Sequence, residues 1–391
     1  MIRVLHSVSN MDRAGIETML MNYYRHMDRE KIQFDFIVNR PKPGDYDDEI
    51  RRMGGRIFQS PGLNPLHYPQ YLRFVQDIIA QDPTIKIVHA HNEAMGLYAL
   101  NGAKHAGVKV RIAHAHCTQI IRDYKWPLKM FCKHFLPSAA TDLWSCGREA
   151  GIYFFGKKNW DTRGVVIHNA IEADSFRFDP SIRAQMRERY GFSDKIVLGH
   201  VGRFSIQKNH ARLLTIFHAF LKLHPNAVLV LVGEGELKEQ ICQQAVALGI
   251  RDKILFAGLQ SDVSRWYQMM DLFLLPSPAE GLPVVGVEAQ AAGLGCIFST
   301  GIPDEVLFSG HSIRCSLSDS DSIWAEKIWQ VLQQPFDRAD GINIIRQAGY
   351  DISVEAAKLQ EMYLQMSVRQ KFFSFQNRAR RRDPCLRYPR F

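Results

Sequence analysis

Two carboxylates interrupt the apolar stretch SPAEGLPVVGVEAQAAGLG at residues 277–295. Glu280 and Glu288 lie eight positions apart, and an acid in such surroundings is costly unless a partner satisfies it. The pattern predicts a turn and then a helix that starts near Pro283 and stops at Gly293. The first backbone N–H groups of that helix can hold anionic oxygens. A carboxylate beside them suits the vicinal hydroxyls of a ribose or a hexose.

The alternative is that Glu280 is only a favourable charge at a helix start and that Glu288 is a solvated position. The valines and alanines around Glu288 leave little polar surface for it, so this alternative is weaker for Glu288 than for Glu280.

A second group of chemically capable residues follows the apolar run KIVLGHVGR at 195–203. The run predicts a strand that ends at Gly202, with Arg203 and Lys208 in the loop before a helix. Small residues, a helix N-terminus and two cations are what α/β proteins use to hold phosphate, and two cations suit a diphosphate. The alternative is a pair of solvated surface charges.

The elements that must position these residues alternate between short apolar runs and amphipathic stretches, which indicates βαβ units and parallel sheets. The pattern runs once through the first half and restarts after residue 170, so the sequence predicts two Rossmann-like domains with a ligand in the cleft between them. The predicted strands are 2–8, 34–39, 87–92, 108–118 and 141–147 in the first domain, and 195–203, 227–235, 254–259 and 271–277 in the second. The predicted parts are an acceptor-side domain at 1–170, a donor domain at 171–352, a helix at 353–366 that returns to the first domain, and a basic aromatic tail at 367–391.

Composition fits a cytoplasmic globular enzyme of two domains. The chain has 391 residues, of which 46% are hydrophobic and 23% charged. Seven scattered cysteines without a CxxC pair argue against a disulfide framework and against a zinc site. We expect no signal peptide and no membrane span, because no apolar segment is long enough. No GxGxxG follows the first strand, which excludes a dinucleotide dehydrogenase.

The net charge of +9 is unevenly distributed, with basic excess in the first 170 residues and in the tail and a mild acidic excess between them. In 119–137, cations alternate with aromatic residues in a pattern that is typical of a membrane-surface helix, and a core-packed helix with a solvated basic face is the alternative. The tail at 367–391 is interpreted as an appendage that is either disordered or attracted to an anionic membrane. The membrane-surface candidates are Arg122, Lys125, Trp126, Lys129 and Lys133.

Several segments in order resemble the retaining GT-B glycosyltransferases of family 4. EGLPVVGVE is similar to their Glu–seven residues–Glu motif, VGRFSIQKN to their donor loop, and VLVLVGEGEL to the end of a donor-domain strand. RAGIETML, RIAHAHCT and VIHNAIEADSF are similar to the glycine loop, the His-bearing loop and the linker between domains. The resemblance covers about residues 1–366, and the acidic segment is most similar to enzymes of capsular and exopolysaccharide assembly.

The resemblance implies roles for particular residues. Arg203 and Lys208 would bind the diphosphate and support its departure, Glu280 would lie near the donor sugar, and Glu288 would bind the ribose. His116 would be the active-site histidine, with His114 as the competing candidate. The remaining donor-binding candidates are Gly15, Gly202, Leu259, Gly281, Leu282 and Val284.

The resemblance thus implies a hexosyltransferase that uses a nucleotide sugar, with UDP favoured over GDP or ADP, and a glycan or lipid-linked glycan acceptor. It implies no cofactor and no metal, because cations and helix amides can stabilise the leaving diphosphate. Peripheral contact with the inner face of a membrane would follow from a lipid-linked acceptor. A GT-B-shaped sugar-nucleotide epimerase is one alternative. A nucleic-acid-binding protein is another, and the acidic middle of the chain argues against it.

Overall fold

The computed structural model describes residues 1–120 and 122–382, the last of them (369–382) by their backbone alone. The chain forms two compact units. One contains residues 1–167 together with the chain from Ser353 onward, and the other contains His168–Ile352. Both units are built on all-parallel sheets, so each is an α/β structure of the kind that the strand and helix pattern predicts.

The sheet of the first unit has seven strands in the order β3-β2-β1-β4-β5-β6-β7. Its strands are β1 (Ile2–Val8), β2 (Ile32–Val38), β3 (Ile57–Gln59), β4 (Ile85–Ala90), β5 (Val110–Ala115), β6 (Asp142–Ser145) and β7 (Gly164–Val166). Because side chains alternate along each strand, neighbouring residues face opposite sides of the sheet. The two sides have very different chemistry.

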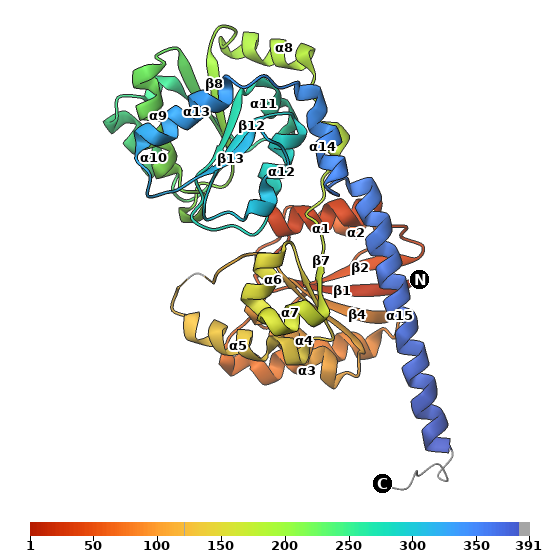
Figure 1. Ribbon diagram of the computed structural model, residues 1–391. Helices are drawn as coiled ribbons and strands as arrows, with labels where there is room; N and C mark the ends of the chain where they lie inside the picture. The colour runs from red at the N-terminus through yellow and green to blue at the C-terminus, as the bar shows by residue number, and fades with distance from the viewer. Residues whose placement is uncertain (121, 383–391) are drawn as a thin grey trace. The chain divides into compact units, whose positions relative to one another are not determined.

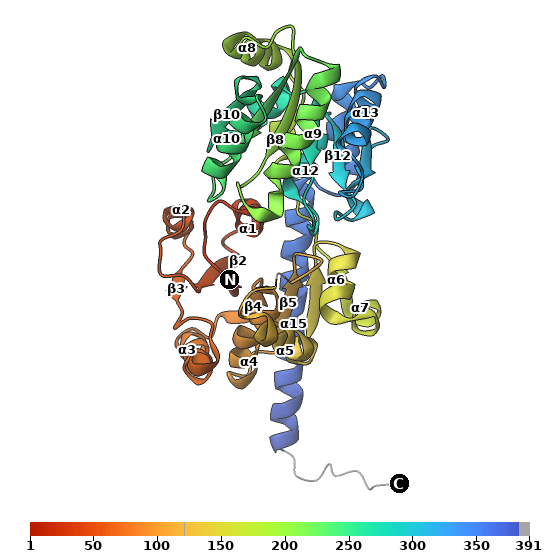
Figure 2. The same ribbon diagram turned by 90° about the vertical axis from the view of Figure 1, so that its left-hand side faces the viewer.

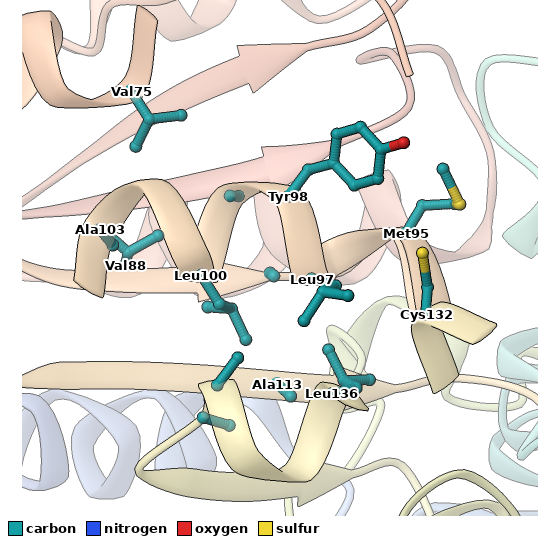
Figure 3. Packing of buried hydrophobic residues seen from close by; sticks show 14 of the residues in the cluster. Val75, Val88, Met95, Leu97, Tyr98, Leu100, Ala103, Ala113, Cys132 and Leu136 are labelled. Atoms are coloured by element: carbon teal, nitrogen blue, oxygen red, sulfur yellow. The ribbon is translucent and has the colours of Figure 1, made fainter. Parts of the chain in front are cut away.

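One side of this sheet carries an aliphatic core. It is covered by α3 (Tyr68–Gln81), α4 (Leu97–His105), α5 (Trp126–Ala139), α6 (Arg148–Phe155) and α7 (Lys157–Arg163). Figure 3 shows Leu97 and Leu100 of α4 directed toward Leu136 of α5. Helices α3 and α4 approach closely at Gly102, where an added Cβ would lie 2.7 Å from the Cβ of Val75.

The opposite side carries aromatic and imidazole rings, and it is covered by α1 (Gly15–His26) and by α15 (Ile352–Arg382). Tyr24 of α1 stacks on Phe34 at 4.9 Å between ring centroids. Tyr363 of α15 stacks on Trp144 at 5.7 Å. Figures 1 and 2 show α15 running alongside this sheet. Residues of α15 therefore complete a core that is otherwise built from residues 1–167.

Helix α15 differs from the sequence-based prediction. The predicted helix ended at 366 and an unpatterned tail followed, whereas α15 continues to Arg382. A stripe of buried residues at helical spacing holds its first half against the first unit: Ala356, Leu359, Tyr363 and Met366. The rest of the predicted tail, residues 383–391, lies outside the described residues.

The sheet of the second unit has six strands in the order β10-β9-β8-β11-β12-β13. They are β8 (Ile196–Val201), β9 (Ala227–Val232), β10 (Ile254–Gly258), β11 (Leu272–Leu275), β12 (Gly295–Ser299) and β13 (Ser312–Cys315). One face packs on α9 (His210–Leu223), α10 (Lys238–Ala247) and α13 (Asp321–Leu332). Figure 1 shows α11 (Ser264–Met269) and α12 (Val284–Ala291) on the other side. Two further helices, α8 (Pro180–Tyr190) and α14 (Gly341–Gln347), pack on α11 and α12.

The remaining elements are short. Helix α2 (Asp47–Arg52) lies between β2 and β3 in the chain. Within the part of the chain that the structure describes, no helix is long and apolar enough to cross a membrane. Six cysteines lie there, at 117, 132, 146, 242, 296 and 315, and all six are free thiols, while Cys385 falls outside it.

The aliphatic core of the first unit is expected to carry much of its stability. Leu100 is completely buried, whereas Leu66 is 90% exposed. Leu100→Ala should lower the free energy of unfolding by about 2–5 kcal/mol, because it leaves a cavity among packed side chains. Leu66→Ala is the matched control and should change it by less than about 0.5 kcal/mol. Chemical denaturation of both variants measures the difference, and equal effects would contradict this account of the core.

Candidate active site

The candidate site of the second unit begins where β8 and β9 end. Gly233 has a φ of +138°, and a Cβ on it would lie only 2.2 Å from the carbonyl oxygen of Gly202. A Cβ on Gly202 would lie 3.2 Å from Cγ of Lys208. The glycines therefore allow the two strand ends and the following loop to pack against one another without side chains between them.

Lys208 and Glu280 form the centre of this site. The Lys208 ammonium donates to Glu280 Oε1 at 2.7 Å, and the Gln207 amide donates to Glu280 Oε2 at 3.0 Å. Both charged side chains are largely buried, with 17% and 10% of their surface exposed. The loop that carries Lys208 is tied to the end of β11, because the Asn209 amide donates to the Pro276 carbonyl at 3.1 Å. Two residues that the sequence analysis selected separately thus lie in direct contact.

Arg203 has a different partner. Its Nε donates to Glu236 Oε2 at 3.0 Å, and 67% of its side chain is exposed. The structure therefore brings Lys208 to Glu280 and leaves Arg203 on the surface at the end of β8, paired with the loop after β9.

The loop after β11 leads into α12 close to where the sequence predicted a helix start. Pro283 is the residue before the helix, which spans Val284–Ala291, and Gly293 follows with a φ of +67°. The N–H groups of the first turn have no partner within a helix. Gly281 and Leu282 are buried in this loop, and the Leu282 carbonyl accepts from the Asn169 amide at 2.7 Å. The linker segment thereby holds the loop in place.

Glu288 lies inside α12 with a partner that the sequence analysis missed. The hydroxyl of Tyr267, on α11, donates to Glu288 Oε2 at 2.9 Å. Burial raises the pKa of Glu288 to about 7, and the Tyr267 hydrogen bond and the charge of Lys208 oppose the rise. This carboxyl is therefore not a solvated surface charge.

The last donor-side candidate, Leu259, follows the end of β10. Its side chain is 63% exposed. The turn at Gly258 has a φ of +71°, and the Gly258 carbonyl accepts from Gly233 N–H at 2.9 Å. Leu259 is thus carried at the same edge of the sheet as the glycines after β9.

In the first unit, the candidate residues also gather where strands end. Gly15 opens α1, and a Cβ on it would meet nothing within 4 Å. Glu17, two residues on, is buried, and burial raises its pKa to about 7. His116 follows β5 and is half-buried, whereas His114 lies within β5 and is only 2% exposed. Of the two histidines, His116 is the more exposed.

Glu93 is a further candidate that no sequence signal identified. It has a φ of +54°, which is uncommon for a residue other than glycine and is often found at functional sites. Its Oε2 accepts from the Cys117 thiol at 3.0 Å, and burial raises the pKa of Glu93 to about 7. The only hint in the sequence is its position just after a predicted strand.

Two Asp-x-Asp triplets, at 45–47 and 319–321, have the spacing of a possible metal-binding motif. Asp45 accepts from the Arg13 N–H at 3.0 Å, and Asp47 pairs with Arg51 at 3.6 Å. Asp319 accepts from the Ser316 N–H at 3.1 Å, and Asp321 pairs with Arg212. These four carboxylates thus make contacts within loops and at the starts of α2 and α13.

The basic aromatic segment is helix α5 and the loop before it. Its cations have partners within the chain: Lys129 pairs with Asp123 at 2.7 Å, and Lys133 lies 3.7 Å from the centre of the Tyr153 ring. Arg122, Lys125 and Trp126 belong to the same segment, and Arg122 lies over the Trp126 ring. The large rings are the exposed part of this surface, with Tyr124 at 87%, Phe131 at 60% and Phe135 at 43%.

Two family models match the chain. "Glycosyltransferase Family 4" matches residues 13–174, and "Glycosyl transferases group 1" matches residues 182–348. The putative glycosyltransferase EpsF of Bacillus subtilis is 34% identical over 368 residues, which cover 92% of this chain and 96% of that protein.

Two relatives at 25% identity carry more specific names. One is a GDP-mannose-dependent α-(1-6)-phosphatidylinositol monomannoside mannosyltransferase of Mycolicibacterium smegmatis, matched over 80% of this chain and 84% of that protein. The other is a UDP-Gal:α-D-GlcNAc-diphosphoundecaprenol α-1,3-galactosyltransferase of Escherichia coli, matched over 91% of this chain and 95% of that protein.

Among solved structures, Anabaena HepE in complex with UDP-glucose superimposes with a TM-score of 0.77 at 16% identity, covering 93% of this chain and all of that one. This likeness confirms the predicted fold. The two parallel sheets, the two family models and the similarity to EpsF along nearly the whole chain lead to one conclusion: the chain belongs to the GT-B glycosyltransferases of family 4.

Proposed function

We propose that the protein is a retaining glycosyltransferase that moves a sugar from a UDP-sugar to a lipid-linked glycan in the assembly of a surface polysaccharide. The observation that carries this proposal is the contact of Lys208 with Glu280 at the strand ends of the second unit. A buried cation is suited to a diphosphate, and the carboxylate beside it is suited to sugar hydroxyls.

In the proposed reaction, the diphosphate leaves with negative charge that fixed positive groups stabilise. Lys208, Arg203, the Leu282 amide in the loop before α12 and the Val284 amide at its first residue would supply that stabilisation, with no cofactor and no metal required. Gly15 and Gly202 would let the backbone approach the phosphates closely. Glu280 would orient the sugar, Glu288 the ribose, and Leu259 would lie at the edge of the base.

The donor and acceptor classes rest on relatives as well as on chemistry. Of the two 25%-identical relatives, one is named for a UDP-sugar and the other for GDP-mannose, and both are named for lipid acceptors. The exposed rings of α5 fit a lipid acceptor, because aromatic side chains settle at membrane interfaces. We therefore place the enzyme at the inner face of a membrane, bound peripherally.

The deciding experiment is a donor panel. UDP-, GDP- and ADP-sugars are supplied one at a time with a diphosphoundecaprenol-linked sugar, and the product is analysed by NMR. Transfer from a UDP-sugar with retention at the anomeric carbon supports the proposal. An inverted product would overturn the retaining class, and interconversion of nucleotide sugars without transfer would point to an epimerase.

The first prediction concerns nucleotide binding. UDP at about 100 times its Kd should stabilise the protein by about 2.7 kcal/mol and raise its Tm. Lys208→Ala and Arg203→Ala should each remove most of this rise, because the diphosphate loses a cation. Lys222→Ala, an exposed lysine of α9, is the control and should keep it. Thermal scans with and without UDP test this, and equal rises in all four proteins would contradict it.

The second prediction separates the two acids. Glu280→Gln should lower kcat by about 10²-fold, because it removes charge beside the reacting sugar. Glu288→Gln should mainly raise the donor KM, by about tenfold, since a lost hydrogen bond to a charged group costs about 1.5 kcal/mol. Glu326→Gln changes an exposed carboxylate of α13 and is the control. Steady-state kinetics would contradict the assigned roles if the first two variants kept wild-type activity.

The third prediction concerns the membrane. Because the cations of α5 are already paired, the exposed rings should carry the contact. Phe131→Ser combined with Phe135→Ser should reduce co-sedimentation with anionic vesicles of phosphatidylglycerol and phosphatidylethanolamine by about tenfold, since about 0.8 kcal/mol is lost per methylene-sized group withdrawn from the bilayer. Val246→Ser, at an exposed valine of α10, is the control. Unchanged sedimentation of the double variant would refute the α5 surface as the contact.

A further inference from the structure

Five histidines lie on the ring-bearing side of the first sheet. His6 lies in β1, His89 lies in β4 and His91 directly follows it, and His114 lies in β5 and His116 directly follows it. Residues two apart on a strand face the same side, so both pairs point to one face. The imidazoles are within reach of one another across three adjacent strands.

Hydrogen bonds divide these rings into two chains. In the first, His6 Nδ1 lies 3.0 Å from His91 Nε2, and His91 Nδ1 lies 2.9 Å from His116 Nε2. In the second, the Tyr363 hydroxyl lies 2.8 Å from His89 Nδ1, and His89 Nε2 lies 3.1 Å from His114 Nδ1. Only the first chain ends at the candidate active-site histidine.

Burial favours the neutral form of the rings in the first chain. Burial lowers the pKa of His6 and of His116 to about 3, and it lowers the pKa of His91 well below the ordinary value. A neutral imidazole has one N–H and one bare nitrogen. Each link of the chain therefore needs a donor on one ring and an acceptor on the next.

The His6 end of this row of hydrogen-bonded histidines determines which ring donates and which accepts at each link. His6 Nε2 is buried and has no hydrogen-bond partner. A buried N–H without a partner is rarer than an under-used acceptor, so the proton of His6 belongs on Nδ1. His6 then donates to His91 Nε2, and His91 must carry its proton on Nδ1. His91 in turn donates to His116 Nε2, which leaves the proton of His116 on Nδ1.

We propose that His6 and His91 are positioning residues that hold His116 as the neutral Nδ1–H tautomer, so that His116 donates a hydrogen bond to the substrate and cannot accept its proton. The proposal rests on the transferase function proposed above and assigns one step of it. The proton of the acceptor hydroxyl must then pass to another group, such as an oxygen of the departing diphosphate. A fixed donor also suits developing negative charge, since it needs no rearrangement during the reaction.

The direct test is the tautomer of His116. Long-range ¹H–¹⁵N spectra of protein labelled only at histidine distinguish a protonated from a bare ring nitrogen, and loss of one signal set in His116→Gln assigns that ring. We expect a protonated Nδ1 and a bare Nε2 in the unliganded wild-type protein. An Nε2–H tautomer or an imidazolium at pH 7.5 would overturn the proposal. This readout needs no activity, so it separates failure of the inference from failure of the proposed function.

Variants at His91 test the consequence for turnover. The amide of His91→Asn can take the place of Nδ1 and still donate to His116, whereas the amide of His91→Gln reaches only the Nε2 position toward His6. We expect kcat within about twofold of wild type for the Asn variant and about tenfold lower for the Gln variant, with the donor KM unchanged in both. His89→Gln is the control: it makes the same substitution in the second chain of rings and should leave the His116 tautomer unchanged. Equal losses in the Asn and Gln variants would refute the role of Nδ1.

A bound transition metal is the competing explanation of the cluster. Nitrogen atoms of His6, His89 and His91 lie within 4.8 Å of one another, as do those of His91, His114 and His116. Hydrogen bonds at 3.0 Å to His6 and at 2.9 Å to His116 already use both nitrogens of His91, which favours the hydrogen-bonded chain. Metal analysis of the purified protein after dialysis against Zn²⁺ alone should find less than one equivalent. One equivalent of zinc that is lost in His91→Gln would overturn the tautomer assignment.

Discussion

Both units depend on one geometric constraint, which is that every strand of a sheet runs in the same direction. The carboxyl ends of parallel strands then lie at one edge, and the loops that follow them meet there. Lys208 follows β8 and Glu280 follows β11, so residues separated by 72 positions form an ion pair. Glu93 and Cys117 meet in the same way after β4 and β5. The fold collects polar groups at one edge while its interior stays apolar.

A second physical feature of the structure is that several of its acidic side chains are buried. Glu17, Glu93 and Glu288 all lose hydration, and burial raises the pKa of each to about 7. Two of these carboxyl groups lie in the first unit and one in the second, and burial favours the protonated form of each. At Glu280, a cation and an amide donate directly to the two carboxylate oxygens.

The fold class followed well from the sequence, since long alternating apolar segments identify strands and helices reliably. The helix expected from Pro283 to Gly293 is α12, one residue shorter at its start and two at its end. Strands β3, β7, β12 and β13 were not identified; β3 and β7 have only three residues each, too few for a clear pattern. The length of α15 was also missed. No Gly or Pro occurs between Ile352 and Pro384 to stop it, but the loss of apolar periodicity suggested an end.

Candidate residues could be selected from the sequence where a local motif contains them, but their partners could not, because tertiary packing selects the partners. Glu280 and Lys208 were identified from local patterns. Tyr267 could not be linked to Glu288, because a tyrosine in a short helix carries no such signal. The histidine chain was equally hidden, since the pairing of β1 with β4 and of β4 with β5 decides which rings meet. Arg203 was selected with Lys208, yet its partner is Glu236.

The discontinuity of the first unit has a consequence for biosynthesis. Its sheet is complete by residue 166, but one of the two helices that cover the ring-bearing side, α15, begins only at Ile352. During translation the whole of the second unit emerges from the ribosome before Tyr363 can reach Trp144 and His89. The rings that α15 covers therefore stay exposed to solvent until residues 352–363 have been synthesised, and this side of the first unit can be closed only after the second unit has been made.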